Sequence, residues 1–146
     1  MDLVDRYLSQ LLNAGNLSGA GEILALDFRF YGPSTRSGLD APGFMRFLAE
    51  ARAAFSNKRF TELDRIAGPD RVALRFRMTG THDGSFHGIP PTGSTIDVEG
   101  CDVIYIRDEK ICEIRAYFDL MPIVQSLLVP LPLKIVGGLL GSFFPR

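Results

Sequence analysis

Four polar side chains alternate along the segment EIRAYFD, which lies near the end of the chain, and together they could carry proton-transfer chemistry. In an extended strand every second residue shares a face, so these side chains would line one side while apolar side chains line the other. The polar set is Glu113, Arg115, Tyr117 and Asp119, and the apolar set is Ile114, Ala116 and Phe118. We therefore expect the polar face to line a pocket.

Asp119 is the candidate general base of this face. Its neighbours Phe118 and Leu120 are apolar, and burial among apolar groups raises the pKa of a carboxyl towards the pH at which it can accept a proton. Asp is also a preferred residue before the first turn of a helix, and helical sequence follows the segment DLMP. The residues alone leave both roles open, the catalytic base and the helix cap.

Other side chains could complete a site around Asp119. His82 could orient Asp119 or donate a proton to a developing alkoxide, or it could lie in solvent beside an Asp-Gly turn. Tyr117 and Tyr31 have hydroxyls that could hold a substrate carbonyl oxygen, although tyrosines also pack in cores. Arg115 could bind an oxyanion or a substrate carboxylate.

The last expected hairpin predicts a partner for Arg115. If residues 108–109 form its two-residue loop, Asp102 lies opposite Arg115 and Val98 lies opposite Asp119. This register predicts a salt bridge between Asp102 and Arg115, and it leaves Asp119 without a cation directly across. Asp102 thereby joins the candidate substrate-binding residues.

The elements that must position these residues are helices followed by strands. Apolar residues at helical spacing predict helices over residues 3–14, 18–26 and 41–55, with a brief strand over 27–34. From residue 58 the apolar period is two, and turn signals predict strands near 58–67, 70–82, 94–107 and 110–119, then a helix over 122–128. Consecutive strands with short turns form an antiparallel meander. The expected fold class is α+β, a curved antiparallel sheet packed on N-terminal helices.

Composition limits the classes of function. The chain has 146 residues, a formal net charge of −1 and scattered basic residues, which gives no electrostatic reason to expect nucleic acid. Cys101 and Cys112 lack the spacing of a zinc site or a disulfide framework. The first fifteen residues read as an amphipathic helix rather than as a signal peptide, so a cytoplasmic location is expected.

Two stretches resemble the signature of a known family. GTHDGSFHGIPPTGSTI and IYIRDEKICEIRAYFD are similar to the SnoaL-like polyketide cyclases and ester cyclases, of the nuclear-transport-factor-two-like superfamily. The resemblance, over about residues 75–128, implies a cone-shaped α+β barrel with a deep pocket between sheet and helices. It also implies intramolecular aldol ring closure without a metal or organic cofactor. It places Asp119 at the catalytic position and His82 at the pocket rim, whereas Arg115 stands where the family often has Trp.

The C-terminal segment is unusually apolar. We expect a SnoaL-like domain over residues 1–128 and an apolar tail over 129–146, whose only charges are Lys134 and Arg146. Prolines and paired glycines break the tail too often for a spanning helix. A lid over the pocket or a homodimer contact is favoured, and a membrane-surface contact is less favoured because the tail has few basic residues.

These observations predict a cofactor-independent cyclase that acts by general acid/base catalysis on a hydrophobic polyketide-like substrate. The predicted catalytic residues are Asp119 and His82, and the predicted substrate-binding residues are Arg115, Tyr117, Tyr31 and Asp102. One alternative is an isomerase or an epoxide hydrolase on a terpenoid or polyketide, because two Asp residues with an Arg could imitate an Asp-Arg-Asp site. A further alternative is a non-catalytic module for ligand binding or dimerisation.

Overall fold

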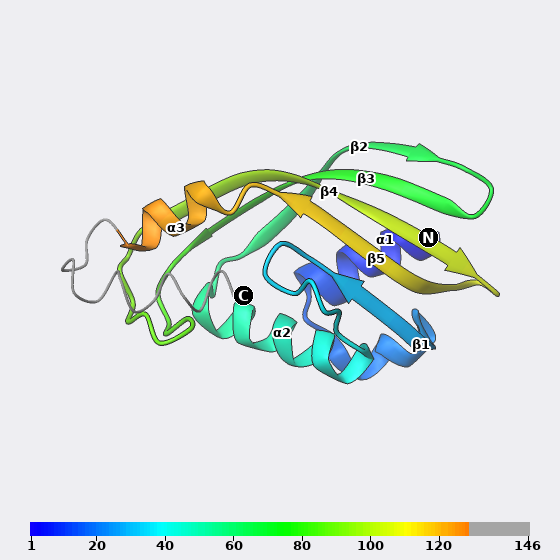
Figure 1. Cartoon of the computed structure of the whole chain (residues 1–146), viewed down its shortest axis with the longest axis horizontal. Coiled ribbons are helices and arrows are strands. Elements are labelled where there is room, and N and C mark those ends of the chain that lie inside the picture. The colour runs from blue at the N-terminus through cyan, green and yellow to red at the C-terminus, as the bar shows by residue number, and fades with distance from the viewer. Residues whose placement is uncertain (129–146) are drawn as a thin grey trace.

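A computed structural model describes residues 1–128, in which a curved five-stranded sheet covers the helices α1 and α2 (Figure 1). The strand order is β1-β5-β4-β3-β2. The predicted antiparallel meander is confirmed, with β2 at Arg59–Ala67, β3 at Arg71–Thr81, β4 at Thr95–Arg107 and β5 at Lys110–Phe118. The edge strand β1, Leu24–Tyr31, pairs with β5 in parallel.

Helices form where apolar residues recur at helical spacing. The bounds are α1 at Leu3–Arg6, continued by a π-helical segment at Tyr7–Asn13, a 3₁₀ helix at Leu17–Glu22, α2 at Ala41–Ala54 and α3 at Met121–Leu128. Asp40 caps α2 as predicted, because its carboxylate accepts a hydrogen bond of 2.8 Å from the backbone N–H of Gly43. The predicted helix over 18–26 is wrong at its end, since residues from Leu24 onward pair with β5 and this tertiary pairing outweighs local helix propensity.

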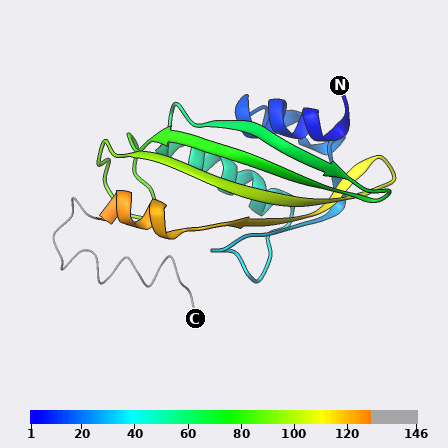
Figure 2. The same cartoon turned by 90° about the horizontal axis from the view of Figure 1, so that it is seen from above.

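The core lies between the inner face of the sheet and the helices. Figure 2 shows α2 running along the sheet, and α3 follows β5 at one end of it. Aromatic rings join α2 to β1, since the ring centroid of Phe44 lies 4.6 Å from that of Phe30 and 5.3 Å from that of Phe28. Each buried Phe contributes about 1.5–3 kcal/mol of hydrophobic stabilisation.

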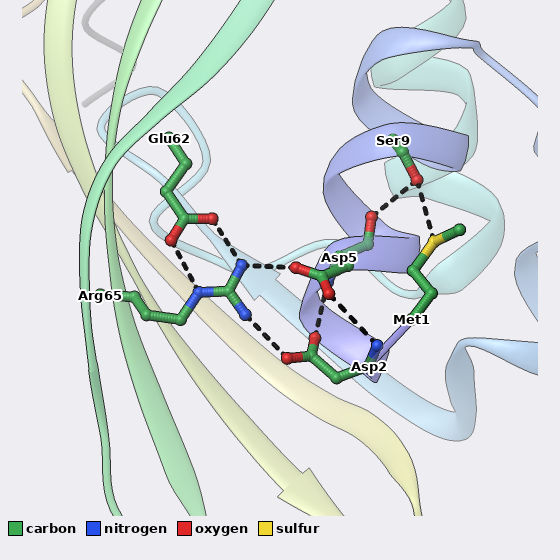
Figure 3. A network of polar contacts seen from close by, with 6 residues as sticks. All are labelled: Met1, Asp2, Asp5, Ser9, Glu62 and Arg65. Carbon is green, nitrogen blue, oxygen red and sulfur yellow. Dashed lines mark hydrogen bonds and ion pairs between the residues drawn. The ribbon is translucent and has the colours of Figure 1, made fainter.

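The N-terminal helix is fixed to β2 at both of its ends. At its start, the guanidinium of Arg65 contacts Asp2 at 2.9 Å, Asp5 at 2.7 Å and Glu62 at 2.5 Å (Figure 3). At its end, the Asn13 side chain bonds to the backbone of Phe60 in β2. Its Oδ1 accepts a hydrogen bond of 2.8 Å from the Phe60 N–H, and its Nδ2 donates one of 2.9 Å to the Phe60 carbonyl. These contacts set the position of the intervening helical residues over the sheet.

A β-bulge corrects the predicted register of the last hairpin. The two-residue loop at 108–109 is confirmed, with both residues at positive φ, 51° and 60°. The pairs that flank the bulge are Ile106 with Ile111 and Tyr105 with Glu113. Cys112 is therefore an extra residue, and beyond it Asp102 lies opposite Ala116 and not opposite Arg115. A shift of one residue turns the following side chains to the other face, so Asp102 and Arg115 lie on opposite faces of the sheet.

In residues 1–128 no helix is long and apolar enough to cross a membrane. The predicted tail over 129–146, with its expected role as a lid, dimer contact or membrane-surface contact, lies outside the described residues.

Candidate active site

An apolar cavity of about 110 Å³ lies between the inner face of the sheet and the helices. Phenylalanine is the most frequent residue in its lining, with rings contributed by β1, α2 and the residue after it, β2, β3, β5 and the loop after β3. The side chains with polar groups in this lining are Tyr7, Ser34, Thr35, Lys58, His87 and Asp102. A small number of polar groups in an apolar concavity is typical of a ligand or active site.

Asp102 is the buried carboxyl of this cavity. Buried and less buried residues alternate along β4, and Asp102 occupies an inward position with only 3% of its surface exposed. Its Oδ2 accepts a hydrogen bond of 3.0 Å from the hydroxyl of Tyr7. Burial raises the pKa of Asp102 to about 7, and the hydrogen bond from Tyr7 offsets only part of this effect. Near neutral pH the carboxyl can both accept and return a proton, as general acid/base catalysis requires.

Tyr7 is held beside Asp102 by the anchored N-terminal helix. The residue is 1% exposed. Burial, followed by the charge of Asp102, raises the pKa of Tyr7 well above 10, so its hydroxyl stays protonated and donates the hydrogen bond. The sequence analysis does not single out Tyr7, because its spacing places it among the apolar residues of the first predicted helix. The available signal was the hydroxyl itself, since a tyrosine on a buried face normally requires a hydrogen-bond partner.

Asp119 lies at the surface and not in the cavity. Its side chain is exposed, and Oδ1 accepts a hydrogen bond of 2.9 Å from the backbone N–H of Met121 in the first turn of α3. This is the capping alternative, in which a carboxylate satisfies a free N–H at a helix start. The prediction that the polar face of β5 lines a pocket does not hold for this cavity, because Ala116 and Phe118, on the other face of the strand, line it; Arg115 and Tyr117 line a separate groove.

Arg115, Tyr31 and Tyr117 come together on the other face of β5. The guanidinium of Arg115 lies 4.4 Å from the ring centroid of Tyr31 and contacts Glu113 at 2.5 Å. Arg115, Tyr31 and Tyr117 line an open groove of about 410 Å³. The predicted salt bridge between Arg115 and Asp102 is wrong, because the β-bulge places the two side chains on opposite faces. The predicted substrate-binding residues are thus divided between two locations.

His82 anchors the loop over residues 83–94. Its side chain is fully buried, and its Nδ1 lies 2.9 Å from the hydroxyl oxygen of Thr92. Burial lowers the pKa of His82, and Nε2 has no hydrogen-bond partner in the described part of the chain. No hydrogen bond within residues 1–128 joins His82 to Asp119. His82 is not among the residues that line the cavity, whereas the loop that it anchors contributes His87.

The described residues contain no group of three His, Cys, Asp or Glu side chains that could hold a metal ion. Cys101 and Cys112 are free thiols. The polar side chains that line the cavity supply carboxyl, hydroxyl, amine and imidazole groups.

Comparison with known proteins identifies a family and a shared fold. A family model described as SnoaL-like polyketide cyclase matches residues 2–127. A solved structure of a candidate SnoaL-like polyketide cyclase from Jannaschia sp. CCS1 is 23% identical, with a TM-score of 0.80, and the match covers 88% of this chain and 91% of that one. The comparison with curated proteins found no match.

Two Streptomyces proteins have similar structures. AclR from Streptomyces galilaeus, a candidate hydroxylase, is 25% identical with a TM-score of 0.76, over 89% of this chain and 95% of AclR. IdmH from Streptomyces antibioticus, a candidate polyketide cyclase, is 24% identical with a TM-score of 0.73, over 87% of this chain and 94% of IdmH. These neighbours have the cone-shaped nuclear-transport-factor-two-like fold that the family resemblance implied.

Proposed function

Because this chain belongs to the SnoaL-like polyketide cyclase family, we propose that it closes a ring by intramolecular aldol chemistry, with Asp102 as general acid/base. The proposed substrate is a hydrophobic, polyketide-like compound with two carbonyl groups. The observation that carries the proposal is a single one: the apolar cavity contains a buried carboxyl whose pKa is about 7 and whose orientation is fixed by Tyr7.

One carboxyl is sufficient for the whole reaction. The ionised Asp102 takes a proton from the carbon beside the first carbonyl, and the C–H electron pair becomes part of an enolate. The enolate carbon then attacks the second carbonyl carbon, so a C–C bond forms and the second oxygen becomes an alkoxide. Asp102 gives its proton to that alkoxide and is again ionised. The addition neither consumes nor releases a proton, and when Asp102 exchanges its proton with solvent before the C–C bond forms, the event appears as exchange of the α-proton.

The surroundings of Asp102 assist each proton transfer. Tyr7 donates to one carboxylate oxygen, which leaves the other oxygen available to the substrate. The phenylalanine walls exclude water, and this strengthens the electrostatic interactions inside the cavity. Because the cavity has a volume of only about 110 Å³, we propose that it takes the reacting end of the substrate.

The test uses a small diketone, heptane-2,6-dione, which closes by the same addition to 3-hydroxy-3-methylcyclohexanone and then loses water to give 3-methylcyclohex-2-enone. In D₂O, NMR follows the exchange of its α-protons, and ultraviolet absorbance follows the enone product. Asp102→Asn should lower the protein-catalysed rate by about 10²- to 10⁴-fold, the usual contribution of a general base. The matched control is Asp97→Asn, since Asp97 lies on the same strand but is exposed and paired with Arg77.

Asp119→Asn separates this proposal from the one based on sequence alone. If Asp119→Asn abolishes exchange while Asp102→Asn retains it, the catalytic base is Asp119. If the wild-type protein does not accelerate exchange above buffer, the acid/base proposal fails and a non-catalytic binding module takes its place. Exchange without ring closure would favour an isomerase, in which Asp102 returns the proton to a different carbon.

A further inference from the structure

Lys58 supplies the cavity with an amine that the mechanism above does not use. It lies between the end of α2 and the start of β2, and its side chain is half-buried. Its Nζ lies 5.3 Å from the ring centroid of Phe60, which also lines the cavity. Within residues 1–128, this Nζ forms no hydrogen bond and no ion pair. No carboxylate in that part of the chain therefore stabilises its ammonium form.

The surroundings of Lys58 shift its protonation equilibrium towards the neutral amine. Burial, and then the nearby positive charge of Arg52, lower the pKa of Lys58 from 10.5 to about 8. At pH 7 this change raises the neutral fraction from about 0.03% to about 9%. A neutral amine has a free electron pair, and a desolvated lysine in an apolar pocket is an activated nucleophile for carbonyl carbon.

We propose that Lys58 is a second catalytic residue of the cavity and forms an imine with the substrate ketone or aldehyde. The inference rests on the proposed aldol function and deepens it, because it adds activation of the carbonyl by Lys58 to the proton transfers by Asp102. It also restricts the substrate class. The carbonyl that loses its α-proton must be an unhindered ketone or aldehyde, and esters and carboxylic acids are excluded at that position because they do not form imines.

The steps balance without a further reactant. The Lys58 nitrogen attacks the carbonyl carbon, and the carbonyl oxygen takes a proton to give a carbinolamine. A proton from solvent joins the carbinolamine hydroxyl, the C–O bond breaks, water leaves, and the protonated imine withdraws electrons from the neighbouring C–H bond. Asp102 removes the proton of that bond, the enamine attacks the second carbonyl to form the C–C bond, and the alkoxide that results takes the proton back from Asp102. One water then hydrolyses the protonated imine, which restores the ketone and the free amine of Lys58 and returns one proton to solvent.

The experiment traps the imine by reduction. The full-length protein is incubated with cyclohexanone and sodium cyanoborohydride, which converts an imine into a stable secondary amine, and peptide mass spectrometry measures the adduct at each lysine. Lys110 is the internal control, because it is partly exposed at the hairpin, does not line the cavity, and its Nζ donates a hydrogen bond of 2.5 Å to the carbonyl of Gly21. Lys58→Met removes the amine at similar length, and Lys58→Arg retains a cation that cannot form an imine.

At neutral pH, the adduct on Lys58 should form at least tenfold faster than that on Lys110, and its rate should rise with pH around pH 8. Both Lys58 variants should lose this fast adduct, with circular dichroism checking that they are folded. Equal labelling of Lys58 and Lys110, or no adduct on Lys58, would overturn the inference.

Asp102→Asn separates the two proposals. This variant should still trap the imine at Lys58, because imine formation precedes the proton abstraction by Asp102. Exchange of α-protons without trapping at Lys58 would remove the imine and leave the acid/base proposal standing. Trapping at Lys58, with exchange unchanged in Asp102→Asn, would retain the imine and reject Asp102 as the base.

Discussion

The ionised form of Asp102 destabilises the folded protein, and Asp102→Asn measures that effect without any substrate. Asn has nearly the shape of Asp, can accept the hydrogen bond from Tyr7, and carries no charge at any pH. We expect the variant to resemble the wild-type protein in stability near pH 4 and to be more stable near pH 8. The pH dependence follows from the difference between the folded and unfolded pKa values of Asp102.

In the unfolded chain the Asp102 carboxyl titrates near its ordinary value of 3.8, whereas in the folded protein it titrates at about 7. Below pH 3.8 the Asp102 carboxyl is protonated in both the folded and the unfolded state, so it does not reduce the free energy of unfolding. Between these two values the folded state holds a proton that the unfolded state has lost, so the free energy of unfolding falls as pH rises. A difference of about three pKa units corresponds to about 4 kcal/mol, and this is an upper estimate of the stabilisation in Asp102→Asn above pH 7.

Urea unfolding followed by circular dichroism, at several pH values from 4 to 8, measures this difference between wild type and variant. Asp97→Asn is the control, because its ion pair with Arg77 lowers the pKa of Asp97. The ion pair of Asp97 stabilises the folded protein above the ordinary pKa of aspartate, and this stabilisation is lost as pH falls. Asp97→Asn should therefore be less stable than wild type near pH 8, whereas Asp102→Asn should be more stable. If Asp102→Asn differs from wild type by the same amount at all pH values, or is less stable near pH 8, the raised pKa of Asp102 is refuted.

Three further results are expected. The rate of α-proton exchange in heptane-2,6-dione should rise with pH around a midpoint near 7, since Asp102 must be ionised, and should be flat in Asp102→Asn. Tyr7→Phe should raise the pKa of Asp102, because it removes the hydrogen bond that lowers it, and should reduce the free energy of unfolding by about 1–3 kcal/mol; an unchanged pKa in an NMR titration would contradict this. Arg65→Leu should lower the Tm by a few degrees in dilute buffer and by less in high salt, because it removes a partly exposed ion network; a Tm loss that is independent of salt would show that packing dominates.

The sequence predicted most of the fold because its patterns are local and strong. The period-two segments and their turn signals define β2 to β5 within one residue at every boundary, and the Asp40 cap marks the start of α2. The strand β1 was less predictable, because its pairing with β5 joins residues far apart in the sequence. Local propensity does not report such pairing.

The site was less predictable because one residue changes which side chains face the core. Without the bulge at Cys112, the hairpin loop would place Asp102 and Arg115 on one face, and the sequence has no turn residue that reveals the bulge. The family resemblance placed Asp119 at the catalytic position, whereas the carboxyl that is buried in the structure is that of Asp102. Tyr7 and Lys58 were missed because each lies in a segment whose pattern indicates only a helix or a strand start, and their meeting at one cavity is a tertiary property.

The most direct test of the central claim is the titration of the Asp102 carboxyl itself. Carbon NMR of the protein labelled at aspartate side-chain carbonyls, with Asp102→Asn to assign the signal, measures this pKa. We predict a midpoint near 7, the value at which the group can take and return a proton at neutral pH. A midpoint near the ordinary value of 3.8 would show that Asp102 is a permanently ionised carboxylate, and the proposed acid/base cycle would then be contradicted.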